Sequence, residues 1–454
     1  MASYADFIKA KSQLDAGAGF APLFMPSYLF DFQEYLTDFA IRMGRSAVYA
    51  DCGMGKTVCQ LVWAENVVRK TNKPVLVLAP LSVSLQTVEE AEKFGLEAVR
   101  CGDGKMKPGA RIVTANYERL HYFNPHDFAG VVCDEASILK NFDGARKGEI
   151  NEFMRLIEYR LLATATPSPN DYIELGTSSE ALGYLGYMDM LSTFFKNDED
   201  SLHPAFIGSK WRFKRHAEQR FWRWMASWSR ACRKPSDLGF EDCSMVLPEL
   251  TVREHKVVSP PPSGYLFEVP AVTLEDQRKD TKATIPLRCE RAAELLADTE
   301  CAVAWCHLNE EGNLIEKLIP GAVQISGADS DDKKEEVFAA FRHGKIKKLI
   351  TKPKIAAFGM NWQHCHRMTY FPSHSWEQYY QAMRRFWRFG QQNGVVVDAI
   401  TTTGQTNVIG NWHRKAAACD EMFAQLVQHM NNAIKLDRMT EFKGEAKLPS
   451  WLQR

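Results

Sequence analysis

The residues with the clearest chemistry form the run ADCGMGKT, from Ala50 to Thr57. This run follows a short apolar segment and precedes a helical pattern, which is the context of a phosphate-binding P-loop. Gly53 and Gly55 would let backbone N–H groups approach phosphate oxygens at the start of the helix. Lys56 would then reach the β and γ phosphates, and Thr57 would hold Mg²⁺. Because Ala50 replaces the first glycine of the strict motif, an ordinary glycine-rich turn remains the alternative for this run alone.

A pair of acidic residues, Asp134 and Glu135, follows the apolar segment 131–133. An aspartate at the end of a buried strand is placed to bind Mg²⁺, and the adjacent glutamate can orient and deprotonate an attacking water. The alternative is an acidic pair that caps the following helix. The P-loop upstream favours a nucleotide site.

A basic segment near the other end of the chain carries Gln381, Arg385 and Arg388 at spacings i, i+4 and i+7. This spacing predicts one face of a helix. Two planar guanidinium groups on one face suit phosphate oxygens, so we interpret them as arginine fingers. A solvated basic helix, or a surface that touches a nucleic-acid backbone with Arg384, is the alternative. A phosphate site built from both ends of a chain is what an ATP-driven motor needs, since hydrolysis can then open and close a cleft.

Two further candidates carry weaker signals. Gln33 lies upstream of the P-loop, and its amide could read the donor and acceptor edge of adenine. The segment Thr164–Pro167 could couple the nucleotide site to the cleft, or it could be a plain turn.

Short apolar runs alternate with longer helical patterns in both halves of the chain, which predicts parallel strands buried on both faces of two sheets. We therefore expect an α/β fold of two parallel-sheet lobes in tandem. The predicted strands are 47–50, 75–79, 112–115, 131–134 and 161–164, followed by 302–305, 323–326, 348–351, 368–371 and 395–400.

The segment between the two lobes has a different composition, rich in Trp, Arg and Phe, and the Pro-rich run 259–264 reads as part of a linker. We expect the following division: an N-terminal segment 1–28, a first lobe 29–180, a helical insertion 181–247, a linker 248–280, a second lobe 281–430 and a tail 431–454.

The insertion contains an amphipathic pattern that predicts a helix running to Lys234. Its apolar stripe comprises Phe221, Trp224, Trp228 and Cys232, whereas Arg220, Arg223, Arg230 and Lys234 lie on nearly the opposite side. Outward arginines would contact phosphates without reading sequence, and binding would then be sensitive to salt. The tryptophans could instead stack on exposed bases, or the helix could simply be a charged, solvated one.

Taken in order, these segments resemble the motifs of superfamily-two helicases of the Swi/Snf-like branch, over residues 29–391. The whole chain also resembles the compact helicase-like proteins carried by bacteriophages and bacteria. The matching segments are 51–57 (motif I), 78–82 (Ia), 114–118 (Ib), 134–141 (II), 164–170 (III), 357–361 (V) and 381–391 (VI). Three positions depart from the pattern: Ser137 replaces a histidine, and Ala165 and Ala357 replace glycines.

The resemblance implies two RecA-like lobes with ATP and Mg²⁺ between them and DNA crossing both. It adds Gly359 and Gln381 to the nucleotide site, and it implies that Ser82, Thr114 and Tyr117 face a nucleic-acid backbone. The function implied is an ATP-dependent translocase on double-stranded DNA. The alternatives are a strand-separating DNA or RNA helicase, and a nucleic-acid-binding scaffold with a vestigial nucleotide site.

The composition limits which partners and which cellular compartment the protein is expected to have. The formal net charge is +0, so binding of nucleic acid has to come from local basic surface. No apolar run approaches the ~20 residues of a membrane span, and no apolar leader is evident at the N-terminus. The 11 cysteines form no CxxC pair, which predicts free thiols in a reducing cytoplasm. We expect a monomer in the cytoplasm of a bacterium or of a phage-infected host cell.

Overall fold

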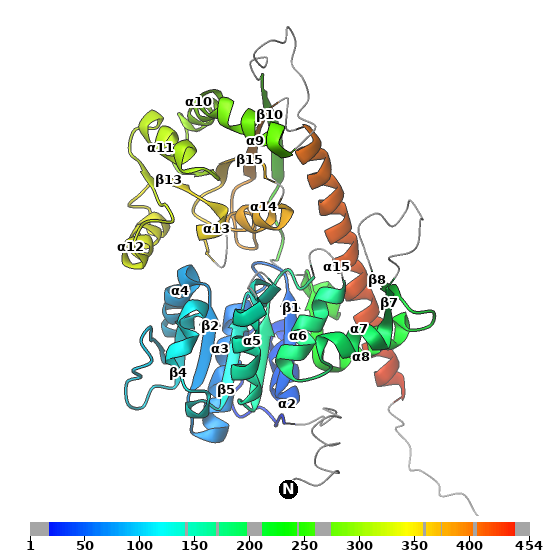
Figure 1. The fold of residues 1–454 in the computed structure, drawn as a ribbon. Coiled ribbons are helices and arrows are strands. Elements are labelled where there is room, and N and C mark those ends of the chain that lie inside the picture. Colours follow the sequence, from blue (N-terminus) through cyan, green and yellow to red (C-terminus); the bar gives the residue numbers. More distant parts are fainter. Residues whose placement is uncertain are drawn as a thin grey trace, which may run out of the picture.

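The protein folds into two α/β lobes, one above the other in Figure 1. The computed structural model describes residues 18–140, 144–168, 172–197, 211–242, 245–258, 274–356, 360–373, 375–402 and 406–440. Each lobe is built on a parallel sheet, as the alternation of apolar runs and helical patterns predicts.

The sheet of the first lobe has seven strands, all parallel, in the order β3-β4-β2-β5-β6-β1-β9. The strands are β1 (Arg45–Ala50), β2 (Val75–Ala79), β3 (Ala98–Arg100), β4 (Ile112–Asn116), β5 (Gly130–Asp134), β6 (Tyr159–Ala163) and β9 (Ser229–Cys232).

Alternate residues of these strands enter two separate cores, because successive side chains of a strand point to opposite faces. Val75 and Val77 pack with Trp63 on one face, whereas Leu76 and Leu78 pack on the other. The lobe's helices are α2 (Asp31–Met43), α3 (Lys56–Thr71), α4 (Leu81–Lys93), α5 (Gly144–Arg155), α6 (Leu175–Leu182), α7 (Tyr187–Phe194) and α8 (Glu218–Trp228).

The prediction of one helix through Lys234 is wrong beyond Trp228, where α8 ends. The next residues form β9, which pairs with β1 in the register Ala47↔Ser229 to Ala50↔Cys232. The edge of β1 offers backbone hydrogen bonds and two apolar faces, and these outweigh the helical pattern of the sequence. The range predicted as a helical insertion therefore supplies a strand of the first sheet. It also contributes a short antiparallel hairpin of β7 (Phe195–Asn197) and β8 (Trp211–Phe213).

The second sheet has six parallel strands in the order β10-β15-β14-β11-β13-β12. They are β10 (Leu250–Val257), β11 (Ala302–Trp305), β12 (Ala322–Gln324), β13 (Lys348–Thr351), β14 (Arg367–Tyr370) and β15 (Val395–Thr402). Strand β10 and most of helix α9 (Leu274–Ala283) fall within the range predicted as a linker, 248–280. The other helices of this lobe are α10 (Ile285–Leu296), α11 (Asn309–Leu318), α12 (Asp331–Arg342), α13 (Pro353–Ala356) and α14 (Trp376–Met383).

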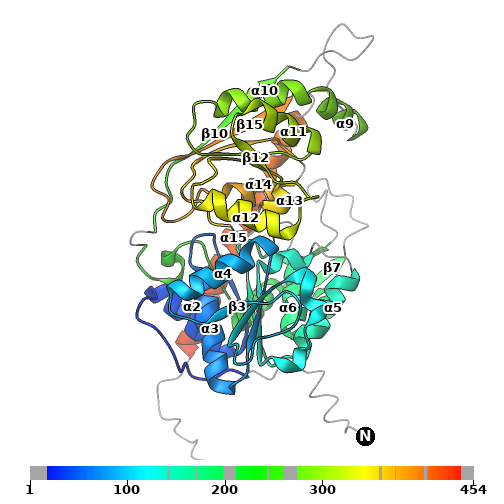
Figure 2. The same cartoon turned by 90° about the vertical axis from the view of Figure 1, so that its left-hand side faces the viewer.

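Helix α12 of the second lobe lies opposite α4 of the first (Figure 2), and an ion pair joins Arg342 to Glu89 across that contact. Because α4 follows β2 and the P-loop follows β1, the second lobe approaches the carboxyl ends of the first sheet's strands. Crevices at this end of a parallel sheet are the usual ligand sites of α/β folds.

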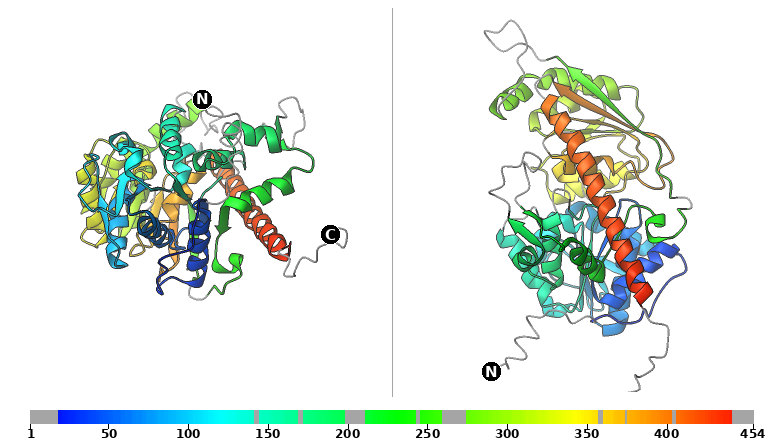
Figure 3. Two further views of the ribbon diagram at one scale, coloured as in Figure 1. Left: turned by 90° about the horizontal axis from the view of Figure 1, so that it is seen from below. Right: turned by 90° about the vertical axis from the view of Figure 1, so that its right-hand side faces the viewer.

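The last helix, α15 (Thr406–Thr440), spans both lobes and runs down the side of the molecule (Figure 3). Near its start, Trp412 packs in the core of the second lobe. Farther along, Phe423, Leu426 and Met430 belong to the core of the first lobe, beside α8. In the described part of the chain no helix, α15 included, is long and apolar enough to cross a membrane.

We expect Leu426→Ala to destabilise the first lobe by about 2–5 kcal/mol, because it leaves a cavity in a close-packed core. Chemical denaturation followed by intrinsic fluorescence measures the change. Gln428→Ala, at an exposed position of the same helix, is the matched control. Equal stability of both variants would contradict the packing of α15 on the first lobe.

Candidate nucleotide site between the lobes

The P-loop joins β1 to α3 and needs glycine at two positions. Gly53 and Gly55 have φ values of +89° and +74°, a left-handed conformation that glycine adopts without strain. A Cβ at Gly55 would lie 2.2 Å from Nε2 of Gln33, and one at Gly53 would lie 2.9 Å from the backbone nitrogen of Phe389. The loop is therefore packed against the first lobe on one side and against the second lobe on the other.

Side chains of the site hold the loop in shape. Nζ of Lys56 donates to the carbonyl oxygens of Ala50 (2.8 Å) and Asp51 (3.1 Å). Nε2 of the buried Gln33 donates to the carbonyl of Met54 (3.1 Å), so its amide contacts the loop that would carry the phosphates. Thr57 follows Lys56 in the first turn of α3.

The predicted acidic pair lies beside the P-loop, at the carboxyl end of β5. Oδ1 of Asp134 accepts a hydrogen bond from Gln60 on α3 (2.7 Å). Oε2 of Glu135 accepts a longer one from Thr164 (3.4 Å). The backbone of Glu135 has a φ of +50°, which is unusual for a residue other than glycine and is typical of functional sites.

Burial and the neighbouring charge of Glu135 raise the pKa of Asp134 to about 6. A divalent cation would relieve this penalty, so the buried carboxylate fits a Mg²⁺ ligand. In the described ranges, this site included, no three His, Cys, Asp or Glu side chains converge on a metal position. A site with one or two carboxylates suits Mg²⁺, which commonly takes its remaining ligands from water and substrate phosphates.

Hydrogen bonds connect the acidic pair to the second lobe. The hydroxyl of Thr164 bonds Glu135 and also accepts from the backbone nitrogen of Thr166 (3.1 Å). The hydroxyl of Thr166 in turn accepts from Nε2 of Gln381 on α14 (3.2 Å). The segment Thr164–Pro167 thus links the two halves of the site.

The predicted arginine pair meets the P-loop, but it does not lie on one helical face. Helix α14 ends at Met383, and the residues after it form turns. The prediction is wrong here because Nε of Arg385 takes the carbonyl of Gln381 (2.9 Å), while its backbone nitrogen bonds Ala382 instead. Nη2 of Arg385 lies 2.8 Å from Oε1 of Gln381 and 3.8 Å from Sγ of Cys52 in the P-loop.

Arg388 lies next to Arg385 and is in an unfavourable environment for a cation. Burial and the positive charge of Arg385 lower its pKa to about 10. Its Nη1 donates to the carbonyl of Met360 at 3.5 Å, and its Nε has no hydrogen-bond partner within the described residues. Two neighbouring guanidinium groups beside a P-loop, that of Arg385 buried and that of Arg388 half-buried, form a site that an anion would stabilise.

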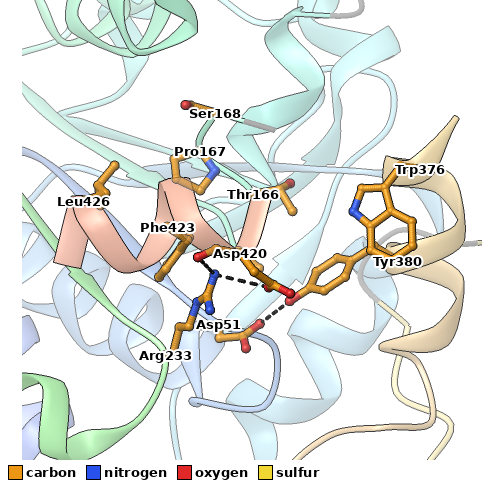
Figure 4. Close-up of a pocket in the computed structure, with 11 residues that line it drawn as sticks. Asp51, Thr166, Pro167, Ser168, Arg233, Trp376, Tyr380, Asp420, Phe423 and Leu426 are labelled. Atoms are coloured by element: carbon orange, nitrogen blue, oxygen red, sulfur yellow. Dashed lines mark hydrogen bonds and ion pairs between the residues drawn. The ribbon is translucent and has the colours of Figure 1, made fainter. Parts of the chain in front are cut away.

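A second arginine contact joins the lobes, which the sequence motifs did not indicate. Nη2 of the buried Arg384 lies 2.6 Å from Oδ2 of Asp51, the residue that follows β1. The hydroxyl of Tyr380 donates to the other oxygen of Asp51 (3.0 Å), and Figure 4 shows these two side chains pointing toward each other. Only the opposite charges of Asp51 and Arg384 could have signalled this pair, and their contact depends on how the lobes dock.

Two of the residues expected to face nucleic acid are buried instead. The hydroxyl of Thr114 donates to the carbonyl of Ser84 (3.3 Å), and that of Tyr117 donates to the carbonyl of Asp134 (2.7 Å). Tyr117 therefore supports the backbone of the acidic pair. The side chain of Ser82, at the start of α4, and all of Gly359 lie outside the described residues.

The expected basic face of the insertion is only partly present. Arg220 and Arg223 are exposed on α8. Arg230 is half-buried: its guanidinium lies 3.7 Å from the ring centroid of Phe39 and donates to the hydroxyl of Tyr35 (3.1 Å). The prediction that Arg230 points outward is wrong, because the residue lies in β9 rather than on a helix. Lys234 is exposed and pairs with a neighbouring carboxylate.

A groove of about 540 Å³ lies between the lobes. The sequence did not predict that its lining residues come together. It combines residues of motifs Ia and Ib with residues of α12 and α13. Its lining includes the cations Arg119, Lys334 and Lys354 and the carboxylates Glu118, Asp331 and Glu335.

No protein-family model matches the chain. Over 199 residues, 40% of the chain, the sequence is 32% identical to an uncharacterized ATP-dependent helicase, YqhH, of Bacillus subtilis (strain 168), and it covers 35% of that protein. Over 168 residues, 32% of the chain, it is 29% identical to the putative protein p41 of Acyrthosiphon pisum secondary endosymbiont phage 1, of which it covers 36%. The chain thus spans about a third of the length of the curated relatives it matches.

Among solved structures, S. cerevisiae Dbp5 bound to RNA and ADP BeF3 matches with a TM-score of 0.55 at 12% identity, over 88% of this chain and 93% of that one. The SWI2/SNF2 ATPase core of Sulfolobus solfataricus in complex with dsDNA matches with a TM-score of 0.41 at 18% identity, over 84% and 90%. The predicted resemblance to helicases and the fold of two RecA-like lobes are confirmed.

We expect Asp134→Asn to stabilise the protein at pH 7 in the absence of Mg²⁺ and nucleotide. Folding raises the pKa of this carboxyl from 3.8 to about 6, so the ionised form is a cost that grows as the pH rises between these values. Removing the charge should add up to about 3 kcal/mol to the free energy of unfolding. Thermal unfolding at pH 4 and pH 7 measures the difference, with the exposed Asp127→Asn as control. If Asp134→Asn is less stable than the unchanged protein at pH 7, the raised pKa of Asp134 is contradicted.

Proposed function

We propose that the protein is a nucleic-acid-stimulated ATPase that hydrolyses ATP between its two lobes and moves along double-stranded DNA. The observation that carries this proposal is the convergence of residues from both ends of the chain. The P-loop, the acidic pair and the Arg385 turn of the second lobe are linked by hydrogen bonds and contacts at the interface between the lobes. The proposal places the protein in the Swi/Snf-like branch on the form of motifs II and VI.

The buried charges support a role for each group of the cleft. Lys56 would leave the carbonyls of its own loop for the β and γ phosphates, and Arg385 and Arg388 would bind the terminal phosphate. Thr57 and Asp134 would hold Mg²⁺, which neutralises charge on the phosphates. Glu135, held by Thr164, would orient the attacking water and accept its proton.

The groove between the lobes supports a path for the nucleic acid. It is lined by residues of both lobes, so a strand lying in it would sense any change in the distance between them. Contacts of Arg119, Lys334 and Lys354 with phosphates would be independent of sequence, as a translocating protein requires. The exposed Arg220 and Arg223 would add a second contact on α8.

We expect Glu135→Gln to bind ATP normally and to lose about 10²–10⁴-fold in turnover, because a carboxamide cannot accept the proton of water. ATP hydrolysis is measured with duplex DNA, single-stranded DNA, RNA and no nucleic acid. Displacement of the third strand of a DNA triplex tests movement, and a fork substrate tests strand separation.

Strong stimulation by duplex DNA with triplex displacement would support translocation. Fork opening would instead support the strand-separating alternative. Turnover by Glu135→Gln equal to that of the unchanged protein would remove this residue from water activation. A wild-type protein that binds nucleic acid without hydrolysing ATP would favour the scaffold alternative.

We expect charge reversal at Arg119 and Lys354 to weaken stimulation by DNA while hydrolysis without DNA stays unchanged. Each lost phosphate contact should reduce the slope of log K against log salt by about one. Binding is measured by fluorescence anisotropy over a salt series. Lys317→Glu, an exposed change on α11 outside the groove, is the control. Unchanged affinity of the double variant would exclude the groove as the binding surface, and reversal of Arg220 and Arg223 then tests α8.

A further inference from the structure

Asp51 has an unusual number of partners for a single residue of the P-loop. Its backbone nitrogen donates to the carbonyl of Cys232 on β9 (3.0 Å), and its carbonyl accepts from Nζ of Lys56 (3.1 Å). Its carboxylate binds Arg384 (2.6 Å) and accepts from the hydroxyl of Tyr380 (3.0 Å). The Oδ1 that accepts from Tyr380 also accepts from the backbone nitrogen of Cys52 (2.6 Å). The first lobe thus holds the backbone and one carboxylate oxygen of Asp51, and the second lobe contacts both oxygens.

Arg384 likewise makes several contacts with the P-loop. The same Nη2 that meets Asp51 also donates to the carbonyl of Cys52 (3.1 Å). Its guanidinium lies 5.0 Å from the ring centroid of Trp387 and 5.7 Å from that of Tyr380, so aromatic rings flank the cation. Burial disfavours the charged guanidinium, but the carboxylate of Asp51 outweighs it and raises the pKa of Arg384 above its ordinary value.

This pair is unlike the other ion pairs between the lobes. The side chain of Arg384 is 1% exposed and that of Asp51 is 12% exposed, whereas Arg342 and Glu89 are 23% and 40% exposed and Arg100 and Glu335 are 36% and 13% exposed. A buried pair whose charges have further hydrogen bonds fixes geometry, while an exposed pair contributes little.

The position of the pair in the chain gives it a consequence for the arginine fingers. Arg384 directly precedes Arg385, on the turn that follows α14. With Arg384 bound to Asp51 and Cys52, Nη2 of Arg385 lies 3.8 Å from Sγ of Cys52. The residue that binds Asp51 and Cys52 of the P-loop is therefore the immediate neighbour of Arg385 in the chain.

We propose that the Asp51–Arg384 ion pair is a clasp between the lobes that positions Arg385 and Arg388 at the phosphate loop. The clasp rests on the proposed ATPase function, because it acts through the fingers. Arg384 and Asp51 are positioning residues. The pair holds the turn of the second lobe against the start of the P-loop, and hydrolysis depends on that placement.

The test compares Arg384→Met, Asp51→Asn and the double variant with Arg342→Met and Glu89→Gln, which break a more exposed pair between the lobes. A misplacement of about 1 Å in a catalytic group can cost about 10²-fold, so we expect Arg384→Met to lower kcat by about that factor. The KM for ATP and the affinity for a fluorescent ATP analogue should change little. The double variant should be no worse than Arg384→Met alone, since the same interaction is lost once. The two control variants should keep their kcat.

Two further measurements keep the result interpretable. The double variant carries no unpaired buried charge, so it is the variant to use if a single change fails to fold, as thermal unfolding will show. Small-angle scattering without nucleotide measures the distribution of interatomic distances, which should change in the clasp variants, because the lobes can then rotate, and stay unchanged in the control variants. This readout needs no hydrolysis, and it separates failure of the clasp from failure of the proposed function.

A wild-type protein without ATPase activity would overturn the proposed function, and scattering would still show whether the pair holds the lobes. If the wild type is active and the Arg384 and Arg342 variants lose kcat equally, the Asp51–Arg384 pair only helps to hold the lobes together. This result would overturn its positioning role. A loss confined to the KM for ATP, or additive losses for Asp51→Asn and Arg384→Met, would also overturn the clasp.

Discussion

The structure depends on the docking of one turn of the second lobe against the P-loop of the first. Parallel strands place their following loops at one edge of a sheet, so the P-loop, the acidic pair and Thr164–Pro167 all reach the same edge. That edge alone offers a site for phosphates but no cover on its second side. The turn after α14 supplies the cover, and its arginines enter a space from which water is largely excluded.

Burying these charged groups away from water costs free energy, and the interactions of the folded chain alone do not compensate for it. Asp134 is buried beside Glu135, and the half-buried Arg388 lies beside the buried Arg385, so like charges are neighbours on both sides of the interface. Such arrangements destabilise a protein and are typical of functional sites, because a bound ligand of opposite charge removes the penalty. The pair Asp51–Arg384 differs, since its charges compensate each other without a ligand. The cleft therefore contains one contact that stabilises the docked lobes and two clusters suited to a ligand, one for a cation and one for an anion.

Sequence patterns predicted the parts of the fold that depend on residues close together in the chain. Apolar runs of four to six residues gave the central strands of both sheets within two residues of their bounds, since strands buried on both faces need no partner-specific pattern. The short edge strands β3 and β9 were missed because their pairing depends on a neighbouring strand and not on composition. The helical pattern through Lys234 failed for this reason, and so did the outward placement of Arg230. Periodicity placed Arg385 and Arg388 on a helix, whereas bonds of the Arg385 guanidinium to the chain beside it replace that helix with turns.

Helix α15 restricts how the cleft can change. Trp412 fixes its first part in the second lobe, where its indole donates to the carbonyl of Ser373, and Phe423 and Leu426 fix its later part in the core of the first. A helix cannot lengthen without breaking its hydrogen bonds, so wide separation of the lobes would have to extract these side chains from a core or bend the helix. Rotation about the line of α15 breaks neither anchor, and it would change the cleft through small displacements of the motif VI turn. A contact as short and as buried as that between Arg384 and Asp51 is sensitive to displacements of this size, whereas the exposed pair of Arg342 and Glu89 can follow them by rotating its side chains. The contact most sensitive to lobe rotation is therefore made by Arg384, the residue next to Arg385.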